Sequence, residues 1–412
     1  MSVAVFHPGT QHSWQTALAL QQLGQLEWFA TSILHQPDRW PYRLERYAPE
    51  PVARRLREEF GRFSRPGLDL SLVRTAGWSE WIERMANRAG WRRLARQIDA
   101  FGNRRFAALI AAELTSDRPF ALWGYNSCSR HAFELAKRHG RHCILDRTIG
   151  DYRVYNALMD GIADQYGAWF LPTERRVPNR MIEDDIREYE LADQIVVGSE
   201  TAAATIRSCA PDHAAKLKIL PYCFDEALFG SLPGPEPIRP DEPLRLLFVG
   251  QMNPRKGIHH LLEAFSQLPP GAATLTLVGD LRVPRHIFAR YADRVTLIPQ
   301  VPRSQMPGIM ARHHLLVFPS YFEGSALTLV EALAAGLGII QTRASGNGAS
   351  PECGIVLETI DTPTLRAALE QAIDDRDLVN SWRARAQSEA ANYSFARYRE
   401  NVKSLISVAG LI

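Results

Sequence analysis

The sequence predicts an α/β protein built from two doubly wound parallel sheets. Three observations support this prediction. Short apolar runs alternate with amphipathic helical segments, which is the pattern of strand–helix–strand units. The 412 residues exceed the usual size of a single hydrophobic core. A stretch rich in proline and acidic residues, from Asp225 to Pro243, interrupts the alternation and separates two such series.

The first series begins with a strand at Val3–Phe6, a polar turn from His7 to Thr10 and a helix from about Ser13 to Leu23. Later strands are predicted from short apolar runs at residues 26–33, 120–123, 142–145, 194–197 and 217–220. Helices are expected at about residues 129–138 and 178–192, and Ser199 is expected to cap a further short helix.

Residues 38–105 interrupt this series and look like an insertion of Arg-rich helices. Four large apolar residues recur there at helical spacing: Trp78, Trp81, Ile82 and Met85. Such a stripe is more often part of a core than a binding surface, so we expect it to be buried.

The second series starts directly after the proline-rich stretch. Its strands are predicted at residues 244–249, 274–278, 294–298, 314–318 and 337–341. Its helices are predicted at residues 258–268, 304–312 and 325–335, and further helices cover most of the chain after Thr362. Parallel sheets bind ligands outside the carboxyl ends of their strands, so two such sheets predict a ligand cleft where those ends face each other.

Charge, tryptophan and cysteine content limit the location and the partners. Residues 1–150 hold 22 Lys and Arg against 14 Asp and Glu, within a net charge of only +3, and most of the tryptophans lie early. A basic, Trp-rich part could touch an anionic membrane or a phosphorylated acceptor, although a solvated arginine face over an aromatic core is the favoured interpretation. The five cysteines are scattered, which indicates reduced thiols.

The start of the chain and its apolar runs predict a location in the cytoplasm. The first residues enter a strand directly, without the basic and apolar segments of a secretory signal. No apolar run approaches the roughly 20 residues that span a bilayer. Peripheral contact with the inner face of the membrane remains an option, and no nucleic-acid partner is expected.

The most informative segment follows the predicted strand 314–318. Glu323 lies in a sharp turn, small residues from Gly324 open a helix, and Glu331 follows eight residues after Glu323. Free N–H groups at a helix start favour an anion, and carboxylates suit hydroxyl groups, so a nucleotide sugar fits both. The alternative is an ordinary strand–turn–helix unit with a solvated Glu323 and a Glu331 on the helix surface.

A second segment places two cations in the same domain. The strand that begins at residue 244 ends at Gly250, and the loop after it carries Arg255 and Lys256. Two cations at the mouth of a sheet can neutralise a leaving diphosphate. An Arg-Lys-Gly turn alone is commonplace, but together with Glu323 and Glu331 it favours a nucleotide-sugar site.

Four segments of the second series, taken in their order along the chain, resemble the GT-B retaining glycosyltransferases of family 4, which are the glycosyl transferases group 1. The resemblance rests on Phe248-Val249-Gly250, Arg255-Lys256-Gly257, Leu277-Val278-Gly279 and Phe318-Pro319-Ser320-Tyr321-Phe322-Glu323-Gly324. It is specific over residues 244–345, weaker over 190–200 and 220–222, and fades over the first 150 residues.

The resemblance implies a GT-B fold, with two Rossmann-like domains facing a central cleft. The N-terminal, acceptor-side domain would span residues 1–225, with the insertion at about 38–105. A linker would span 226–243 and the donor domain 244–390, and a C-terminal helix within 391–412 would return to the first domain. The implied reaction moves a sugar from a nucleotide-diphosphate sugar to a glycan or lipid-linked acceptor of cell-surface polysaccharide synthesis. The sugar keeps its anomeric configuration, and no metal or other cofactor is expected.

The resemblance also assigns roles to residues. Lys256 and Arg255 would hold the donor diphosphate, Glu323 would contact the hydroxyls of the transferred sugar, and Glu331 would bind the ribose. Gly9 would approach the phosphates from the other domain. The remaining donor-binding residues would be Gly250, Gln300, Val301, Gly324, Ser325, Ala326 and Leu327.

Two departures from the family pattern matter. Gln251 stands where many members have an arginine, and the family's usual histidine near the reacting carbon is not obvious. Asp146 or Asp151, after the strand 142–145, could instead orient the acceptor hydroxyl, and Asp146 is our catalytic candidate. A capping or buried hydrogen-bonded aspartate is the alternative.

Three other functions remain open. They are a nucleotide-sugar hydrolase or epimerase on the same fold, a non-catalytic nucleotide-sugar-binding protein, and a membrane-surface protein. No metal site is expected, because Asp375-Arg376-Asp377 suits a solvated surface and because adjacent histidines, such as His259-His260, should point in different directions on a helix.

Overall fold

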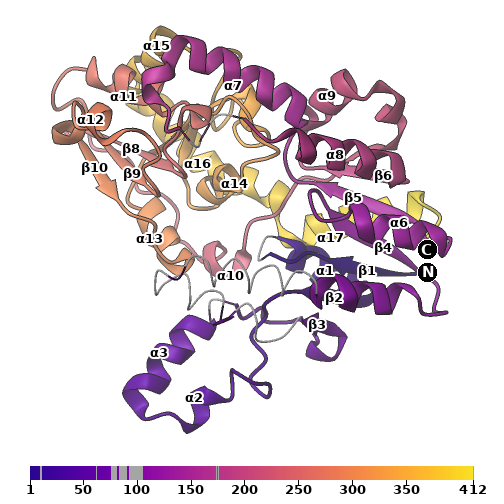
Figure 1. Ribbon diagram of the computed structural model, residues 1–412. Coiled ribbons are helices and arrows are strands. Elements are labelled where there is room, and N and C mark those ends of the chain that lie inside the picture. The colour runs from indigo at the N-terminus through magenta and orange to yellow at the C-terminus, as the bar shows by residue number, and fades with distance from the viewer. Residues whose placement is uncertain are drawn as a thin grey trace. The chain divides into compact units, whose positions relative to one another are not determined.

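The computed structural model describes residues 1–9, 12–61, 63–75, 81–82, 91, 105–172, 174 and 176–411. They form two sheets, one of seven strands and one of six, with helices packed on them (Figure 1). The predicted α/β class with two doubly wound parallel sheets is confirmed.

Contacts divide the chain into two compact units that are interleaved along the sequence. Unit 1 comprises Met1–Asp146, Glu183–Val196 and Arg399–Ile412, and unit 2 comprises Arg147–Ile182 and Val197–Tyr398. Unit 2 therefore includes two segments that lie before the expected linker. The expected domain limits at residues 225 and 243 stay a prediction, and they differ from the limits of these two units.

The seven-stranded sheet has the order β3-β2-β1-β4-β5-β6-β7. Its strands are β1 Ser2–Phe6, β2 Leu26–Thr31, β3 Val73–Thr75, β4 Phe120–Tyr125, β5 Cys143–Arg147, β6 Gln194–Val197 and β7 Leu217–Ile219. The central strands are apolar and buried on both faces, as parallel strands covered by helices must be. Strand β3 was not predicted, because it has only three residues and lies inside the Arg-rich insertion.

The helices along this part of the chain follow the predicted alternation, with three additions, at residues 105–114, 152–166 and 226–229. They are α1 Ser13–Gln22, α2 Leu44–Tyr47, α3 Glu50–Gly61, α6 Arg130–Arg138, α7 Tyr152–Tyr166, α8 Asn179–Leu191, α9 Glu200–Cys209, α10 Glu226–Phe229 and α17 Phe395–Val408. Residues 105–114 are also helical. Helix α7 was not predicted, although Asp151 caps its first turn by accepting a hydrogen bond from the backbone N–H of Arg153.

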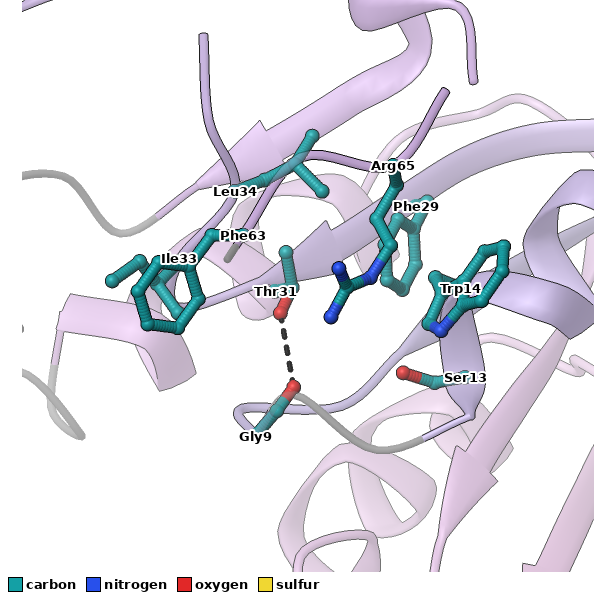
Figure 2. A pocket seen from close by; sticks show the side chains of 9 residues that line it. All are labelled: Gly9, Ser13, Trp14, Phe29, Thr31, Ile33, Leu34, Phe63 and Arg65. Atoms are coloured by element: carbon teal, nitrogen blue, oxygen red, sulfur yellow. Dashed lines mark hydrogen bonds between the residues drawn. The ribbon is translucent and has the colours of Figure 1, made fainter. Parts of the chain in front are cut away.

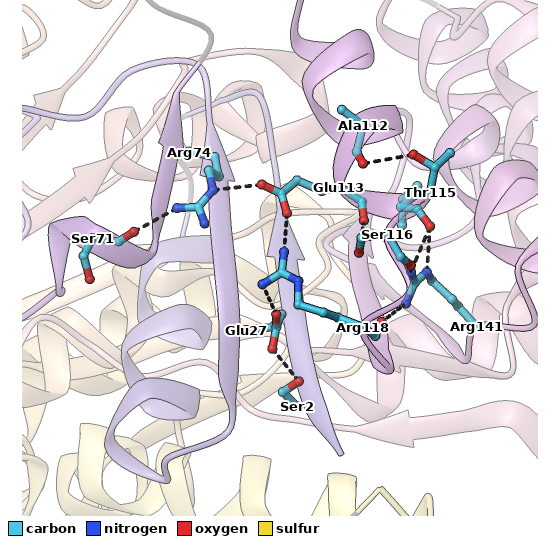
Figure 3. Close-up of polar contacts among 11 residues, drawn as sticks. Ser2, Glu27, Ser71, Arg74, Ala112, Glu113, Thr115, Ser116, Arg118 and Arg141 are labelled. Atoms are coloured by element: carbon cyan, nitrogen blue, oxygen red, sulfur yellow. Dashed lines mark hydrogen bonds and ion pairs between the residues drawn. The ribbon is translucent and has the colours of Figure 1, made fainter.

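An ion-pair network ties β3 and the helical residues 105–114 to the rest of unit 1 (Figure 3). Glu113 pairs with Arg74 of β3 at 2.9 Å and with Arg118 at 2.8 Å, and Arg118 also pairs with Glu27 of β2 at 2.5 Å. Arg141 lies 3.8 Å from the ring centroid of Phe120 and donates to backbone carbonyls of residues 114–118. These contacts hold the two ends of the insertion, β3 and the helical residues 105–114, against the sheet.

The insertion is not purely helical, since β3 belongs to the sheet. Trp81 is buried in an aromatic cluster with Ile33, Tyr42, Phe60 and Phe63, whereas Ile82 is 36% exposed. Trp78 and Met85 lie outside the described residues. The expectation of a buried stripe therefore holds for Trp81 and fails for Ile82.

The six-stranded sheet of unit 2 has the order β10-β9-β8-β11-β12-β13, and all its paired strands are parallel. Its strands are β8 Leu244–Val249, β9 Ala273–Val278, β10 Val295–Ile298, β11 Leu315–Phe318, β12 Gly338–Thr342 and β13 Gly354–Leu357. The α-helices are α11 Ile258–Ser266, α12 Arg285–Phe288, α13 Met306–Met310, α14 Leu327–Ala334, α15 Thr362–Asp374 and α16 Arg376–Ala390. One large apolar core runs between sheet and helices.

Short 3₁₀ helices connect many of these elements. They are η1 Leu70–Leu72, η2 Gly167–Trp169, η3 Pro211–Lys216, η4 Pro254–Lys256, η5 Ala292–Arg294, η6 Arg303–Gln305, η7 Arg343–Ser345 and η8 Ala391–Tyr393. Two of them, η4 and η6, carry cations of the candidate site.

The proline-rich stretch is packed rather than extended through solvent. Ile238 is buried, and its N–H donates to Asn380 Oδ1 of α16 at 2.9 Å. Arg383 of α16 donates to the carbonyl oxygen of Glu236 at 2.6 Å. Residues 236–238 are thus packed on α16 within unit 2, and the interpretation of residues 226–243 as a linker stays a prediction.

The structure also bears on the cysteines and on membrane-spanning helices. None of the five cysteines, all of which lie in described parts of the chain, forms a disulfide bond. In the part of the chain that the structure describes, no helix has both the length and the apolar character needed to cross a bilayer.

Candidate functional site

The candidate site of unit 2 lies where two neighbouring strands end. Strands β8 and β11 pair in parallel, so the loops at their carboxyl ends emerge side by side. The N–H of Tyr321 donates to the carbonyl oxygen of Arg255 at 2.9 Å, and Ser320 Oγ donates to the same oxygen at 3.3 Å. These bonds hold the two loops together and bring their charged side chains into contact.

The loop after β8 is shaped by its backbone. Gly250 has a φ of +145°, a value that favours glycine. Asn253 Oδ1 accepts a hydrogen bond from the N–H of Lys256 at 3.1 Å and so caps η4. The cap fixes Arg255 and Lys256 at the end of a short rigid turn.

Three donors converge on one carboxylate oxygen of Glu323. Its Oε1 lies 2.7 Å from Arg255 Nη1, 2.6 Å from Lys256 Nζ and 2.6 Å from Ser320 Oγ. The side chains of both cations and of Glu323 are at most 16% exposed. The structure therefore brings together three of the four predicted catalytic residues, and without a ligand the glutamate neutralises one of the two cations.

Burial and these contacts act in opposite directions on the titration of the cluster. Burial alone would raise the pKa of Glu323, but Arg255 and Lys256, with the hydrogen bonds of Lys256 and Ser320, hold that pKa below its usual value. Burial lowers the pKa of Lys256, and the Glu323 carboxylate partly offsets that effect. The ammonium also lies 4.5 Å from the ring centroid of Phe318. The glutamate is thus kept ionised in a place with little water.

The segment after Glu323 is extended before the helix begins. Helix α14 starts at Leu327, so the predicted helix start at Gly324 and Ser325 is wrong. The residue before the helix, Ala326, has an extended backbone, and Gly324 packs closely: a Cβ on it would lie 2.0 Å from the carbonyl oxygen of Thr148. The N–H of Ala326 donates to the carbonyl oxygen of Ser345 at 3.2 Å, and Ser199 Oγ donates to that of Gly324. This segment is therefore clamped by neighbouring loops of unit 2.

Glu331 lies on α14 in a separate ion pair. Its Oε1 is 2.5 Å from Arg303 Nη2 of η6, and its side chain is 12% exposed. Burial raises the pKa of Glu331, although Arg303 opposes that shift. Gln300 and Val301 lie on the chain just before Arg303; Gln300 is exposed and Val301 packs partly on the core. Arg303, which follows the predicted base-binding residues closely in sequence, thus contacts the predicted ribose-binding Glu331.

The predicted residues of unit 1 lie at the carboxyl ends of β1 and β5. The N–H of Gly9 donates to His7 Nδ1 at 2.9 Å, and its carbonyl oxygen accepts from Thr31 Oγ1 at 3.2 Å (Figure 2). Burial lowers the pKa of His7, so its ring is neutral at pH 7 and carries its proton on Nε2. The crevice beside Gly9 in Figure 2 has a volume of about 10 Å³, which is room for one water molecule at most.

Asp146 is fully buried at the end of β5. Trp123 Nε1 donates to its Oδ2 at 3.3 Å, and His12 Nε2 lies 4.0 Å from its Oδ1. Asp151, the other aspartate considered for the acceptor, caps α7 and pairs with Arg153 at 2.8 Å. Of the two, only Asp146 lies beside histidines.

The family comparison concerns the part of the chain that carries the cations and both glutamates. Residues 243–375 match the family model for glycosyl transferases group 1. These residues are a glycosyl transferases group 1 domain. The resemblance inferred from the sequence is therefore confirmed for the segment that was predicted to bind the donor.

Curated relatives of the glycosyl transferases group 1 domain are distant and align over part of their length. O-antigen chain mannosyltransferase B from Escherichia coli is 27% identical over 166 residues, 36% of this chain and 42% of that protein. Lipopolysaccharide glucosyltransferase WaaG from Escherichia coli K12 is 28% identical over 172 residues, 39% of this chain and 46% of that protein. The matched segments thus span less than half of these relatives.

Solved structures resemble the whole chain and show its fold. Sucrose-phosphate synthase from Thermosynechococcus elongatus has a TM-score of 0.65 at 16% identity and covers 99% of both chains. HepE from Anabaena in complex with UDP has a TM-score of 0.61 at 14% identity, covering 99% of this chain and 100% of its own. WaaG has a TM-score of 0.59 at 15% identity, covering 98% and 99%. The chain has the GT-B fold.

The structure adds residues that sequence reasoning missed. Arg303 contacts Glu331, and Ser320 contacts Glu323, in the glycosyl transferases group 1 domain. Ser320 stands three residues before Glu323 in the same turn, which is a local signal. Arg303 comes from a loop 28 residues away in sequence, so no local spacing could have paired it with Glu331. In unit 1, His7 contacts Gly9 in the same turn.

Adjacent histidines behave differently from the prediction. The rings of His259 and His260 lie 4.2 Å apart and are both buried, so they do not point in different directions. Burial lowers the pKa of His260 to about 4. Among residues that the structure describes, no group of three or more His, Cys, Asp or Glu side chains is close enough to hold a metal ion. Asp375 and Asp377 are exposed, as expected for a solvated face, and Asp375 also accepts a hydrogen bond from the N–H of Leu378 and so caps α16.

Proposed function

We propose that the chain is a retaining glycosyltransferase that moves a sugar from a nucleotide-diphosphate sugar to a glycan or lipid-linked acceptor. The observation that carries this proposal is the convergence of Arg255 and Lys256 on the buried Glu323 within the segment that matches glycosyl transferases group 1. Relatives named for lipopolysaccharide and O-antigen synthesis support an acceptor in cell-surface polysaccharide assembly.

In this proposal, the two cations bind the donor diphosphate. The leaving nucleotide gains negative charge as the bond to the sugar breaks, and Arg255 and Lys256 stabilise that charge from positions that are already fixed. The chain has Gln251 where many relatives have an arginine, so these two cations carry this task alone. The structure of HepE in complex with UDP supports a uridine nucleotide as the first donor to try.

Glu323 has the transferred sugar as its proposed partner. Its Oε1 is occupied by three donors, and as an ionised carboxylate it has further acceptor positions for sugar hydroxyls. The acceptor hydroxyl would attack from the face that the nucleotide leaves, and its proton would pass to the departing phosphate oxygen. The configuration at the anomeric carbon is then kept.

Further donor contacts are proposed around this centre. The backbone of Gly250 and of Gly324, Ser325, Ala326 and Leu327 would receive phosphate and sugar oxygens. Glu331 would bind the ribose, and Gln300 and Val301 would lie by the base. From unit 1, Gly9 would approach the phosphates, and Asp146 would orient the acceptor hydroxyl. No metal ion or other cofactor takes part in this scheme.

The first test is a thermal-shift screen of the full chain against UDP, GDP, ADP and dTDP sugars. A donor that binds only the folded state stabilises it by RT ln(1 + c/Kd), where c is the free donor concentration, so the unfolding temperature rises with the logarithm of that concentration once it exceeds Kd. The selected donor is then incubated with candidate acceptors, with and without EDTA, and the anomeric configuration of the product is measured by NMR.

The outcomes separate the competing functions. A glycosylated acceptor of retained configuration, formed equally in EDTA, supports the proposal. Free sugar or an epimerised nucleotide sugar as the main product indicates a hydrolase or an epimerase. Donor binding without turnover on any acceptor indicates a binding protein.

A further inference from the structure

A second cavity lies in unit 1, and none of the residues assigned above is among its described lining. It has a volume of about 470 Å³, within the range of cavities that hold small-molecule ligands. Ser32 and Thr75, at the carboxyl ends of the paired parallel strands β2 and β3, form one side of it. This edge of a parallel sheet is where α/β proteins bind ligands.

The other side of the cavity is strongly basic. Arg39, Arg43 and Arg105 line it, with Asp38 as the one acidic residue among the described lining. Asp38 is already paired with Arg46, whose Nη2 lies 2.9 Å from Asp38 Oδ1. Within the described residues, Arg39 and Arg43 have no ion-pair partner, and Arg43 Nε donates only to the backbone oxygen of Asp38. Guanidinium groups in this state are suited to a bound oxyanion.

A buried side chain with an unmet hydrogen bond points to the same conclusion. Gln36 lines the cavity and is only 4% exposed, and its Nε2 has no hydrogen-bond partner in the described structure. Buried amide donors are almost always satisfied, so an unsatisfied one beside a cavity indicates a ligand that accepts its hydrogen bond.

The basic segment is held in place by the aromatic cluster beneath it. Tyr42 packs on Phe60 and Trp81, with ring centroids 5.0 and 5.9 Å apart, and its hydroxyl accepts a hydrogen bond from Trp81 Nε1 at 3.1 Å. The N–H of Arg39 donates to the carbonyl oxygen of Gln36 at 2.9 Å, which closes a turn. The backbone that carries Gln36, Arg39 and Arg43 is therefore held in place before any ligand binds, which lowers the entropy cost of binding.

We propose that this cavity binds a phosphate monoester of about the size of a sugar phosphate. The two guanidinium groups of Arg39 and Arg43, which have no ion-pair partner within the described residues, match a dianionic phosphate better than a singly charged carboxylate. The volume exceeds that of a bare phosphate, and Ser32, Gln36 and Thr75 can bond the hydroxyls of an attached sugar or glycerol. The inference rests on the proposed function in one respect only: in a glycosyltransferase, this phosphate monoester would be part of the acceptor.

The test measures binding to the full chain by calorimetry. The probes are glucose 6-phosphate, glycerol 1-phosphate, inorganic phosphate and glucose, together with vesicles of phosphatidic acid or phosphatidylcholine. The double variant Arg39→Gln/Arg43→Gln removes the two unpaired guanidinium groups. The double variant Arg54→Gln/Arg55→Gln is the matched control, because it removes equal charge from exposed positions of α3 that do not line the cavity.

We expect glucose 6-phosphate to bind more tightly than glucose, and the Arg39/Arg43 variant to weaken that binding at least tenfold. The Arg54/Arg55 control should change it less than twofold. Gln36→Met should weaken binding several-fold without lowering the unfolding temperature, because it removes an unsatisfied buried donor. UDP-sugar binding should be the same in all variants, so a failure of this inference is distinct from a failure of the proposed donor site.

The source of the phosphate follows from the probes. Binding of the soluble esters supports a free sugar phosphate or glycerol phosphate. Binding only to phosphatidic acid vesicles, lost in the Arg39/Arg43 variant and kept in the control, supports the same chemistry on a lipid. Equal losses in both double variants, or no response to any phosphate monoester, would overturn the inference.

Discussion

At the scale of single residues, Glu323 pairs with both cations and neutralises one of their two positive charges. Both Arg255 and Lys256 contact the same oxygen of this carboxylate, so an incoming diphosphate must share them with the glutamate. This arrangement avoids the cost of two buried unpaired charges in the unliganded protein. It also predicts that the three residues differ in what they contribute to donor binding.

The single variants Lys256→Ala and Glu323→Ala should each reduce sugar transfer at least tenfold, because groups that stabilise developing charge contribute about 2–4 kcal/mol. Lys256→Ala should also weaken UDP binding. Glu323→Ala should leave UDP binding intact and weaken only the preference for UDP-sugar over UDP. Calorimetry with both ligands checks this, and near-normal transfer by either folded variant would contradict the assignment.

Glu331 should make stability depend on pH. Burial raises its pKa in the folded protein, so the folded state holds a proton that the unfolded state releases. Its contribution to stability is complete below the unfolded pKa of about 4.3 and is lost as pH rises through the folded value. Glu331→Gln should therefore unfold at a higher temperature than the wild type near pH 8, and this difference should disappear near pH 4.

The same substitution has a functional cost in the proposed scheme. Glu331→Gln should weaken binding of a ribonucleoside diphosphate while it stabilises the protein. Scanning calorimetry at several pH values gives the first effect and calorimetric titration the second. A variant less stable than the wild type at pH 8 would show that the pair with Arg303 outweighs the burial of the carboxylate.

At the scale of elements, the start of α14 depends on one glycine. The extended residues before the helix pass so close to Thr148 that a side chain has no space. Gly161, inside α7 of the same unit, faces open space instead. The two glycines thus allow a matched comparison.

Gly324→Ala should destabilise the fold by about 2–3 kcal/mol, because the added Cβ meets a backbone oxygen that cannot rotate away. Gly161→Ala should stabilise it by about 0.5–1 kcal/mol, because alanine is the better residue inside a helix. Urea unfolding of both variants measures these differences. Equal effects at the two positions would mean that the approach to Thr148 is relaxed in solution.

Elements also show what could be predicted from the sequence. Strands such as β8 and β11 are apolar and bounded by turns, so their ends, and with them Arg255, Lys256 and Glu323, could be placed in advance. β3 could not, since three residues carry no periodicity, and its pairing depends on the distant β2. The pair between Arg303 and Glu331 and the unmet amide of Gln36 depend on tertiary contacts that local patterns do not encode.

At the scale of the whole molecule, two ligand sites are proposed in different units. The charged residues that are proposed to bind the nucleotide sugar belong to unit 2, and the phosphate cavity belongs to unit 1. Hydrogen exchange can examine both at once, because binding slows exchange where it removes local opening.

With UDP, protection should increase most at residues 250–257 and 320–331. With glucose 6-phosphate, it should increase most at residues 32–43. A mass-spectrometric comparison of the two ligands measures both patterns on the same peptides. Protection of the same peptides by both ligands would show that the phosphate monoester binds at the donor site instead.

The interleaving of the units has a consequence for biosynthesis. Arg399, which donates to Gln22 of α1 at 2.7 Å, reaches unit 1 only after all of unit 2 has left the ribosome. Domains usually fold in the order of their synthesis, the N-terminal one first. Here unit 1 also needs residues from the end of the chain. A nascent chain that stops before residue 399 therefore contains the whole sequence of unit 2 but lacks the last segment of unit 1.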